Sequence, residues 1–222
     1  MLELGVKFLI SYFIGSIMGS LVVGRLRGGV DIRTMGSGNA GGTNALRTQG
    51  LVFALAVVII DVGKGVLAAG WVPGLHLPGV PEDPSVDREL LILSCAAASV
   101  IGHVWPIWHR FRGGKGAATL VGTFIVLAPD IILPILLIWA WVLVISGYVG
   151  LSTMTAAVAA PLYLALMRLP HDQALFYYAA LMALYIIYSH RSNIRRMIAG
   201  TESRNTRLMV FRRGRNKAHD EQ

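Results

Sequence analysis

Residues 51–71 read LVFALAVVIIDVGKGVLAAGW, and this stretch decides the class of fold. Asp61 and Lys64 are the charged side chains in an otherwise apolar run. A helix needs roughly 20 such residues to cross the hydrocarbon core of a bilayer. An open sheet cannot cross it, because the N–H and C=O groups at its edges find no partner in lipid. The stretch therefore predicts a membrane-spanning helix.

Other runs of the same kind follow along the chain, some of them shorter than a full span. The nearly uncharged runs are Phe8–Val23, Leu51–Trp71, Leu90–Trp108, Gly116–Ala128, Ile131–Val149, Leu151–Met167 and Ala174–Tyr188. They predict an all-α integral membrane protein with seven transmembrane helices. A five- or six-span arrangement stays open, because Pro129, Asp130 and Pro134 interrupt the fourth and fifth runs.

Composition and charge agree with a membrane protein. Of the 222 residues, 55% are hydrophobic and 14% charged, whereas soluble domains carry about 25% charged residues. The single cysteine, Cys95, excludes a disulfide framework and a cysteine zinc site. The first run has no cleavage-site pattern after it and begins beside Glu3 and Lys7, so we interpret it as a retained helix.

The positions of the cations predict the orientation. With seven spans, one side of the membrane receives 16 of the Lys and Arg residues and the other side three: Lys7, Arg88 and Arg168. Cytoplasmic loops carry the excess of such residues. We therefore expect the N-terminus outside and the C-terminus in the cytoplasm, and we do not expect the net charge of +8 to reflect nucleic-acid binding. The basic tail, residues 204–222, is expected to be mobile.

The first cytoplasmic loop has the chemistry of an anion site. It reads DIRTMGSGNAGGTNALR over residues 31–47. Glycines can turn backbone N–H groups inward into a nest that binds anions, and arginine can hold phosphate in a bidentate manner. A plain flexible linker is the alternative. The candidate ligands of this loop are Gly36, Ser37, Gly38, Asn39, Thr43, Asn44 and Arg47.

The second loop, residues 102–119, reads GHVWPIWHRFRGGKGAAT. Here Gly113, Gly114 and Gly116 surround Lys115, and the next helix is expected to begin at this point with the positive end of its dipole. This combination predicts a second phosphate-binding segment. The alternative is an ordinary membrane-boundary anchor made by the tryptophans and arginines of the loop.

Several other polar residues allow two interpretations. Asp61 and Lys64 lie three residues apart on one helix face, where ionisable groups in lipid mark either function or a structural lock. His103 could be a general base or a hydrogen-bonded packing residue. His190 and Asn193 end the last span, where they could contact substrate or stand among mere anchors.

These segments together resemble the bacterial acyl-phosphate:glycerol-3-phosphate acyltransferase family. The similarity extends from Gly15 to about Glu202. The family's first motif is matched by Gly15-Ser16, Asp31-Ile-Arg, Gly36-Ser-Gly-Asn39, Thr43-Asn44 and Arg47, and its second by Gly102-His103, Pro106 and Phe111-x-Gly-Gly-Lys-Gly116. A further family feature is Asp61-Val-Gly-Lys64-Gly65, and the end of the chain matches at His190-Arg-x-Asn193-Ile with Gly200-x-Glu202. One departure is clear. The family's third motif is Tyr-x-Ser-Leu-x-Ser, and Gly150 stands in place of its first serine, so Ser152 or a neighbour would have to supply that hydroxyl.

The resemblance implies a seven-helix enzyme of the bacterial inner membrane whose active site faces the cytoplasm. Residues 1–203 would form the acyltransferase domain. It also implies a reaction in which long-chain acyl phosphate acylates the 1-hydroxyl of sn-glycerol-3-phosphate, giving lysophosphatidic acid and inorganic phosphate. An acyl phosphate is already activated, so we expect neither a metal nor another cofactor. The sequence leaves the acyl-chain preference and the oligomeric state open, and it is compatible with a monomer.

Our mechanistic hypothesis assigns roles to individual residues. Lys115 and the amides of residues 113–116 would hold the phosphate of the acyl donor. The residues expected to orient glycerol phosphate are Ser37, Arg47, His190 and Asn193. A phosphate oxygen of the substrate would accept the hydroxyl proton, with His103 as the rival base.

Three other classes of protein are weighed against this one. An acyl-CoA-dependent acyltransferase would carry His-x4-Asp, which no histidine here provides. A phosphoalcohol transferase would need clustered aspartates for a divalent metal, whereas Asp31 and Asp61 are isolated. An anion transporter would be favoured by discontinuous helices near the membrane midplane.

Overall fold

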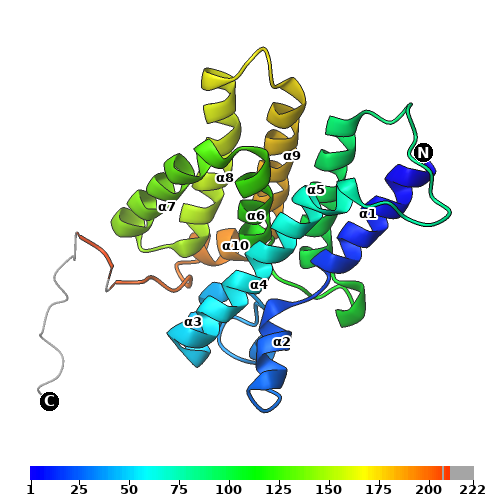
Figure 1. Ribbon diagram of the computed structural model, residues 1–222. Helices are drawn as coiled ribbons and strands as arrows, with labels where there is room; N and C mark the ends of the chain where they lie inside the picture. The colour runs from blue at the N-terminus through cyan, green and yellow to red at the C-terminus, as the bar shows by residue number, and fades with distance from the viewer. Residues whose placement is uncertain (207, 211–222) are drawn as a thin grey trace, which may run out of the picture.

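The computed structural model describes residues 1–206 and 208–210, and these residues form helices and loops without a named strand (Figure 1). The longer helices are α1 (Leu2–Gly15), α4 (Leu51–Gly70), α5 (Arg88–Val104), α6 (Ala117–Leu127), α7 (Ile132–Ser146), α8 (Val149–Met167) and α9 (Gln173–Ser189). Three short α-helices are α2 (Gly19–Leu26), α3 (Gly42–Gln49) and α10 (Arg191–Ile198). Four 3-10 turns are η1 (Ile32–Thr34), η2 (Val72–Gly74), η3 (Ile107–His109) and η4 (Pro129–Ile131). The prediction of an all-α protein is confirmed for the described part of the chain.

Every apolar run of the sequence contains a helix, but the helices differ in length. Within the described residues, four helical segments are long and apolar enough to cross a membrane: 51–74, 88–109, 129–146 and 149–167. A fifth span results if the bent pair α1 and α2 is counted as one. Helices α6 and α9 are apolar but shorter. The number of seven spans and the orientation of the termini stay predictions.

The first run does not form the single helix expected from the sequence. Helix α1 ends at Gly15, α2 begins at Gly19, and the two axes differ by 45°. The break is stabilised from outside the run, by side chains of α4. A hydropathy pattern cannot show this, because Gly15–Gly19 is as apolar as its surroundings. The break expected at Pro129 is confirmed, since α6 ends at Leu127 and α7 begins at Ile132.

Pairs of glycines let the helices approach closely. A Cβ on Gly65 of α4 would lie 2.2 Å from the carbonyl oxygen of Thr119, and one on Gly122 of α6 would lie 2.0 Å from that of Val62. Gly15 and Gly102 make the equivalent contact between α1 and α5. Small residues serve this purpose in membranes, where close packing replaces the hydrophobic effect as the force between helices.

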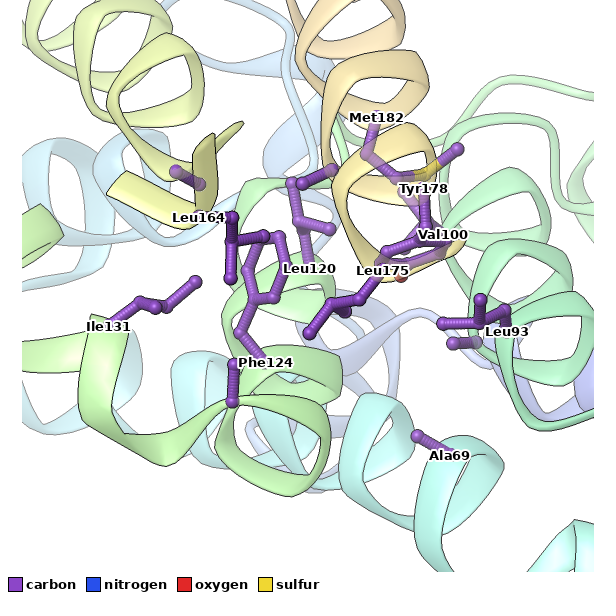
Figure 2. Packing of buried hydrophobic residues seen from close by; sticks show 14 of the residues in the cluster. Ala69, Leu93, Val100, Leu120, Phe124, Ile131, Leu164, Leu175, Tyr178 and Met182 are labelled. Carbon is purple, nitrogen blue, oxygen red and sulfur yellow. The ribbon is translucent and has the colours of Figure 1, made fainter. Parts of the chain in front are cut away.

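Helix α6 lies in the middle of the bundle (Figure 1). The largest hydrophobic cluster surrounds it, with Phe124 and Leu120 packed among residues of α5, α8 and α9 (Figure 2). One polar contact lies within this cluster, where Thr123 Oγ1 and Tyr178 Oη are 2.9 Å apart. The cluster fixes the position of α6, and with it the position of the glycine loop that precedes it.

A buried ion cluster ties α1 to α5 at the N-terminal end of both helices. The Glu3 carboxylate accepts hydrogen bonds from Lys7 Nζ at 2.8 Å and from Arg88 Nη1 at 2.7 Å. Lys7 also donates to the carbonyl oxygen of Pro73 at 2.7 Å. These charges satisfy one another, and they lie at the opposite end of α5 from the second glycine-rich loop.

The described part of the tail contacts the turn between α7 and α8. The Asn205 N–H donates to the Gly147 carbonyl at 2.8 Å, and the Arg204 guanidinium lies over the Tyr148 ring, 4.6 Å from its centroid. Residue 207 and residues 211–222, on which most of the predicted mobile tail falls, lie outside the described residues. The mobility of residues 204–222 stays a prediction.

Candidate active site

A polar cavity of about 600 Å³ lies where the second glycine-rich loop meets the end of α9 and the start of α10. Among residues 1–206 and 208–210, its lining includes five cationic side chains and no acidic one: Arg112, Lys115, Arg191, Arg195 and Arg196. The remaining lining residues are Asn39, Val104, Trp105, Phe111, Gly113, Gly114, Ser189 and Ser192. Such an excess of positive charge suits a ligand with more than one phosphate charge.

Glycines shape the loop that carries Lys115. A Cβ on Gly113 would lie 2.1 Å from the His103 carbonyl oxygen, and one on Gly114 would lie 2.1 Å from His103 Nε2. The Gly114 N–H donates to the His103 carbonyl at 3.1 Å, so this amide is already used within the protein. Gly116 has a φ of +86° and directly precedes α6. Lys115 therefore lies at a helix N-terminus, as the sequence predicts.

Lys115 is held by the last two helices. Its Nζ donates to Asn193 Oδ1, and its carbonyl oxygen accepts a hydrogen bond from Ser189 Oγ at 2.9 Å. Burial, together with nearby Arg196, lowers the pKa of Lys115 to about 8 against the opposing effect of Glu202. At neutral pH the ammonium is still charged, and it is poorly solvated in the free protein. An anionic ligand would supply the missing counter-charge.

Asn193 is buried and fixed through a carboxylate that sequence reasoning did not place in the site. Asn193 Nδ2 donates to Glu202 Oε1 at 2.6 Å, and Arg196 Nε donates to Glu202 Oε2 at 2.5 Å. Since Nδ2 is committed to Glu202, Oδ1 faces Lys115. Lys115, Asn193, Glu202 and Arg196 thus form one hydrogen-bonded row beside the cavity.

His190 lies next to this row, at the junction of α9 and α10. Its Nδ1 is 2.8 Å from the Ile186 carbonyl oxygen, which can only accept, so Nδ1 carries the proton and Nε2 holds the lone pair. Burial, and then the charge of Lys115, lower the pKa of His190 to about 4. The ring is therefore neutral at physiological pH.

The first loop contributes less to the cavity than expected. Among its residues, Asn39 lines the cavity, whereas Gly36, Ser37, Gly38, Thr43 and Arg47 do not. Asn44 is buried and its amide is fully occupied, with Oδ1 accepting from the Ser37 N–H at 3.0 Å and Nδ2 donating to the Ile32 and Met35 carbonyls. Asn44 thus shapes this loop. Its side-chain amide donates to the protein's own carbonyl groups, so it is not available to bind phosphate in this structure.

Asp31 and Arg33 pair with each other within the same loop. Arg33 Nη2 lies 2.7 Å from Asp31 Oδ2, and these hydrogen bonds hold the pKa of Asp31 below its usual range. The pair closes the turn before Gly36. Arg33 is therefore committed to an internal partner in this structure.

Two further predicted residues lie away from the cavity lining. Ser152 is buried and its Oγ donates to the Tyr148 carbonyl at 2.9 Å. His103 is also buried, with Nδ1 2.6 Å from Lys64 Nζ. Within residues 1–206 and 208–210, no three His, Cys, Asp or Glu side chains converge in a manner that could hold a metal ion.

Comparison with known proteins decides the family. The sequence pattern described as glycerol-3-phosphate acyltransferase matches residues 6–200. The chain belongs to this family.

Similar proteins in the family cover nearly the whole chain. A glycerol-3-phosphate acyltransferase of Salinibacter ruber is 42% identical over 91% of this chain and 93% of its own length, and one of Pelodictyon phaeoclathratiforme is 41% identical over 93% and 98%. Two crystal structures of PlsY (YgiH), an integral membrane glycerol 3-phosphate acyltransferase, superpose with a TM-score of 0.75 at 30% identity. They cover 90% of this chain and 94% of their own, in a glycerol 3-phosphate form and a lysophosphatidic acid form. The resemblance found in the motifs is thus confirmed, and the chain is a multi-pass membrane acyltransferase.

The departure from the acyltransferase motif at Gly150 has a structural reason. A Cβ at this position would lie 2.9 Å from Asn193 Nδ2 and 3.0 Å from its Cγ. Gly150 therefore lets α10 lie directly against the start of α8, with Asn193 in the space that a serine side chain would use. The idea that Ser152 replaces the missing hydroxyl stays a prediction.

Sequence reasoning missed most of the cavity's arginines. Arg191, Arg195 and Arg196 follow the last apolar run, where basic residues usually serve as membrane anchors. Their spacing could have indicated a shared cationic surface, because Arg191 and Arg195 are four residues apart and lie on one face of α10.

Proposed function

We propose that this acyltransferase moves a long-chain acyl group from acyl phosphate to the 1-hydroxyl of sn-glycerol-3-phosphate. The products are lysophosphatidic acid and inorganic phosphate, in the first step of bacterial phospholipid synthesis. The observation that carries the proposal is that neighbouring residues at the start of α6, here called the junction, line two different cavities. Lys115 lines the cationic cavity, and Ala117 and Ala118 line an apolar one of about 220 Å³.

Each part of the substrate pair has a suitable environment at this junction. The cationic cavity suits phosphate, and the apolar cavity between α6, α7 and α8 suits an acyl chain. The names of the similar crystal structures, a glycerol 3-phosphate form and a lysophosphatidic acid form, support the acceptor and the product. We extend both from those proteins to this chain.

The reaction needs positioning more than a nucleophilic side chain. The 1-hydroxyl oxygen attacks the acyl carbonyl carbon, an ester C–O bond forms, and the bond from the carbonyl carbon to the phosphate oxygen breaks. Phosphate leaves with the bonding electron pair, and the hydroxyl proton passes to a phosphate oxygen. Lys115 at the N-terminus of α6 stabilises the charge on the leaving phosphate.

The acceptor is held by groups around this phosphate. We assign Asn193 and His190, with Arg195 and Arg196 beside them, to orientation of glycerol 3-phosphate. Ser37 and Arg47 keep their proposed roles in orienting glycerol phosphate, on the ground that Asn39 of the same loop lines the cavity. His103 is disfavoured as the base, because the Lys64 ammonium occupies its Nδ1.

We propose the arrangement in the membrane as predicted from the charges. Residues 1–203 form a seven-span domain in the bacterial inner membrane, with the N-terminus outside and the cationic cavity toward the cytoplasm. Residues 204–222 form a basic cytoplasmic tail. Accessibility of single cysteines, introduced at Arg110 and at His76 into a Cys95→Ala background, tests this orientation in intact cells.

An anion transporter, another class weighed from the sequence, would need a discontinuous helix, and the break between α1 and α2 is one. However, the freed backbone groups of this break are bonded to α4: the Gly19 N–H to Asp61 and the Ile17 carbonyl to Lys64. They are not directed at a substrate. This observation favours the acyltransferase.

The donor decides between the possible acyl-transfer reactions. Purified protein is incubated with glycerol-3-phosphate and, separately, palmitoyl phosphate or palmitoyl-CoA, and lysophosphatidic acid is measured. Product from the acyl phosphate alone supports the proposal. Product from palmitoyl-CoA would refute the donor assignment, and product from neither would direct attention to transport.

Affinity for the phosphate-bearing donor should fall at alkaline pH. The pKa of Lys115 is lowered to about 8 by burial, so the ammonium is charged below this pH and loses its proton above it. The KM for acyl phosphate should then rise by about tenfold per pH unit above pH 8. A Lys115→Arg variant that retains activity should lack this rise, because its guanidinium stays protonated. An unchanged KM up to pH 9.5 in the wild type would contradict the role.

The apolar cavity should determine the acyl-chain length. Ala157 of α8 lines it, and phenylalanine there would fill part of the space. Each CH₂ that loses its burial costs about 0.8 kcal/mol, so we expect the preference for a C16 over a C12 donor to fall by about tenfold or more. The control is Val158→Phe. Val158 is the exposed neighbour of Ala157 and does not line the cavity. Equal chain-length profiles for the two variants would place the acyl chain elsewhere.

A further inference from the structure

Asp61 and Lys64 are two charged side chains buried in the middle of α4, with exposed fractions of 1% and 4%. Their charged atoms are 3.0 Å apart. Neither residue lines the cationic or the apolar cavity. Buried ionisable groups in a membrane protein are costly, so their contacts should show what they stabilise.

The first contacts are with the broken helix. Lys64 Nζ donates to the carbonyl oxygen of Ile17 at 2.8 Å, and the Gly19 N–H donates to Asp61 Oδ1 at 3.3 Å. A break within lipid exposes such backbone groups, and each must find a partner inside the protein. The Lys64 ammonium therefore satisfies a backbone carbonyl just after α1, and the Asp61 carboxylate caps the N-terminus of α2.

The second contact is with α5. Lys64 Nζ lies 2.6 Å from His103 Nδ1. An ammonium can only donate, so Nδ1 is the acceptor and the proton of the neutral ring is on Nε2. Lys64 Nζ thus contacts the Ile17 carbonyl, the His103 ring and the Asp61 carboxylate at once. The position of the His103 ring is thus tied to the ion pair.

His103 in turn supports the glycine loop of the cavity. Its carbonyl oxygen accepts the Gly114 N–H at 3.1 Å, and its ring is so close to Gly114 that an added Cβ would lie 2.1 Å from Nε2. Lys115 is the next residue along the chain. A shift of the ring therefore moves the loop that carries the Lys115 ammonium.

We propose that Asp61, Lys64 and His103 form a positioning relay, in which the ion pair fixes His103 and His103 fixes the glycine loop that places Lys115. The relay links the α1–α2 break to the active-site loop without touching substrate. A simple structural lock would stabilise the fold equally well but would leave the surroundings of Lys115 unchanged once the protein is folded. The two roles can therefore be separated.

The test compares the reactivity of the Lys115 amine in three variants. Asp61→Asn/Lys64→Met removes both charges at once, so that no buried charge is left unpaired. His103→Asn keeps an acceptor for Lys64, since the amide oxygen can replace Nδ1, but removes the ring that supports Gly114. Glu3→Gln/Lys7→Gln is the control, because it removes the other buried ion pair, at the opposite end of α1.

Lys115 is labelled with acetic anhydride over a pH series in detergent-solubilised protein, and the peptide is quantified by mass spectrometry. In the wild type the labelling should titrate near the lowered pKa of about 8. A displaced loop exposes Lys115 to water, so both relay variants should raise the midpoint by about one pH unit or more. The control should keep the wild-type midpoint.

Turnover provides a second measurement, which rests on the proposed function. Both relay variants should raise the KM for acyl phosphate several-fold at pH 7, whereas the control should not. Wild-type midpoints in folded relay variants would overturn the relay, and so would an equal rise in the control. A wild type that forms no lysophosphatidic acid would refute the proposed function and leave the labelling result standing.

Discussion

Alanine at position 115 is expected to lower turnover by about 10²- to 10³-fold, the usual cost of removing one preorganised group that stabilises charge in a transition state. Lys115 lines the cationic cavity and lies two residues before Ala117, which begins α6 and lines the apolar cavity. Its loss leaves the departing phosphate without a charge partner at the helix N-terminus. The measurement is formation of lysophosphatidic acid from palmitoyl phosphate at saturating glycerol-3-phosphate.

The same substitution should not unfold the protein. Burial holds the pKa of Lys115 below its unfolded value, so the folded state disfavours the charge and loses little stability when it is removed. The unfolding temperature of Lys115→Ala should therefore stay close to that of the wild type. Arg110→Ala is the matched control, because Arg110 lies in the same loop, is exposed and does not line the cavity. A Lys115→Ala enzyme with more than a tenth of normal turnover would contradict the assignment.

Alanine at Gly65 should give the largest loss of stability. The new Cβ would lie 2.2 Å from the Thr119 carbonyl oxygen, and this backbone atom cannot move without separating α4 from α6. Overpacking of this kind costs about 1–3 kcal/mol or more. For a chain of this length, that corresponds to a decrease in unfolding temperature of roughly 2–12 °C. Thermal unfolding in detergent, followed by tryptophan fluorescence, measures it.

Gly63 provides the control for this substitution on the same helix. A Cβ at Gly63 meets no atom within 4 Å, so alanine there should be neutral or slightly stabilising, because alanine is the better helix former. An unfolding temperature that falls equally at both positions would mean that helix flexibility matters here, and close packing does not. Separation of α4 and α6 should also lower turnover at Gly65, since Lys115 precedes α6.

Some features of the site follow from local sequence. The glycines around Lys115 and the apolar run after Ala117 predict a cation at a helix start, and the structure places Lys115 there. This prediction succeeds because the residues concerned are neighbours in the chain.

Other features depend on which groups become hydrogen-bond partners in the folded chain. Asn44 has the composition of a phosphate ligand, but its amide closes its own loop on Ile32 and Met35. The carboxylate of Glu202 fixes Asn193, and Gly150 makes room for it. A polar residue looks the same in sequence whether its partner is a substrate or another part of the protein.

The sequence by itself determined that this protein is a helical membrane protein of the glycerol-3-phosphate acyltransferase family. Hydropathy and motifs are properties of short stretches of sequence, so they can be identified without knowledge of how the helices pack. Only the tertiary structure decided where the first run breaks and what Lys64 does, because Lys64 bonds to Ile17, 47 residues earlier. The contact of Lys115 with Asn193 spans 78 residues and likewise depends on how α6, α8 and α10 pack. Such partners are selected by helix packing, which local sequence does not specify.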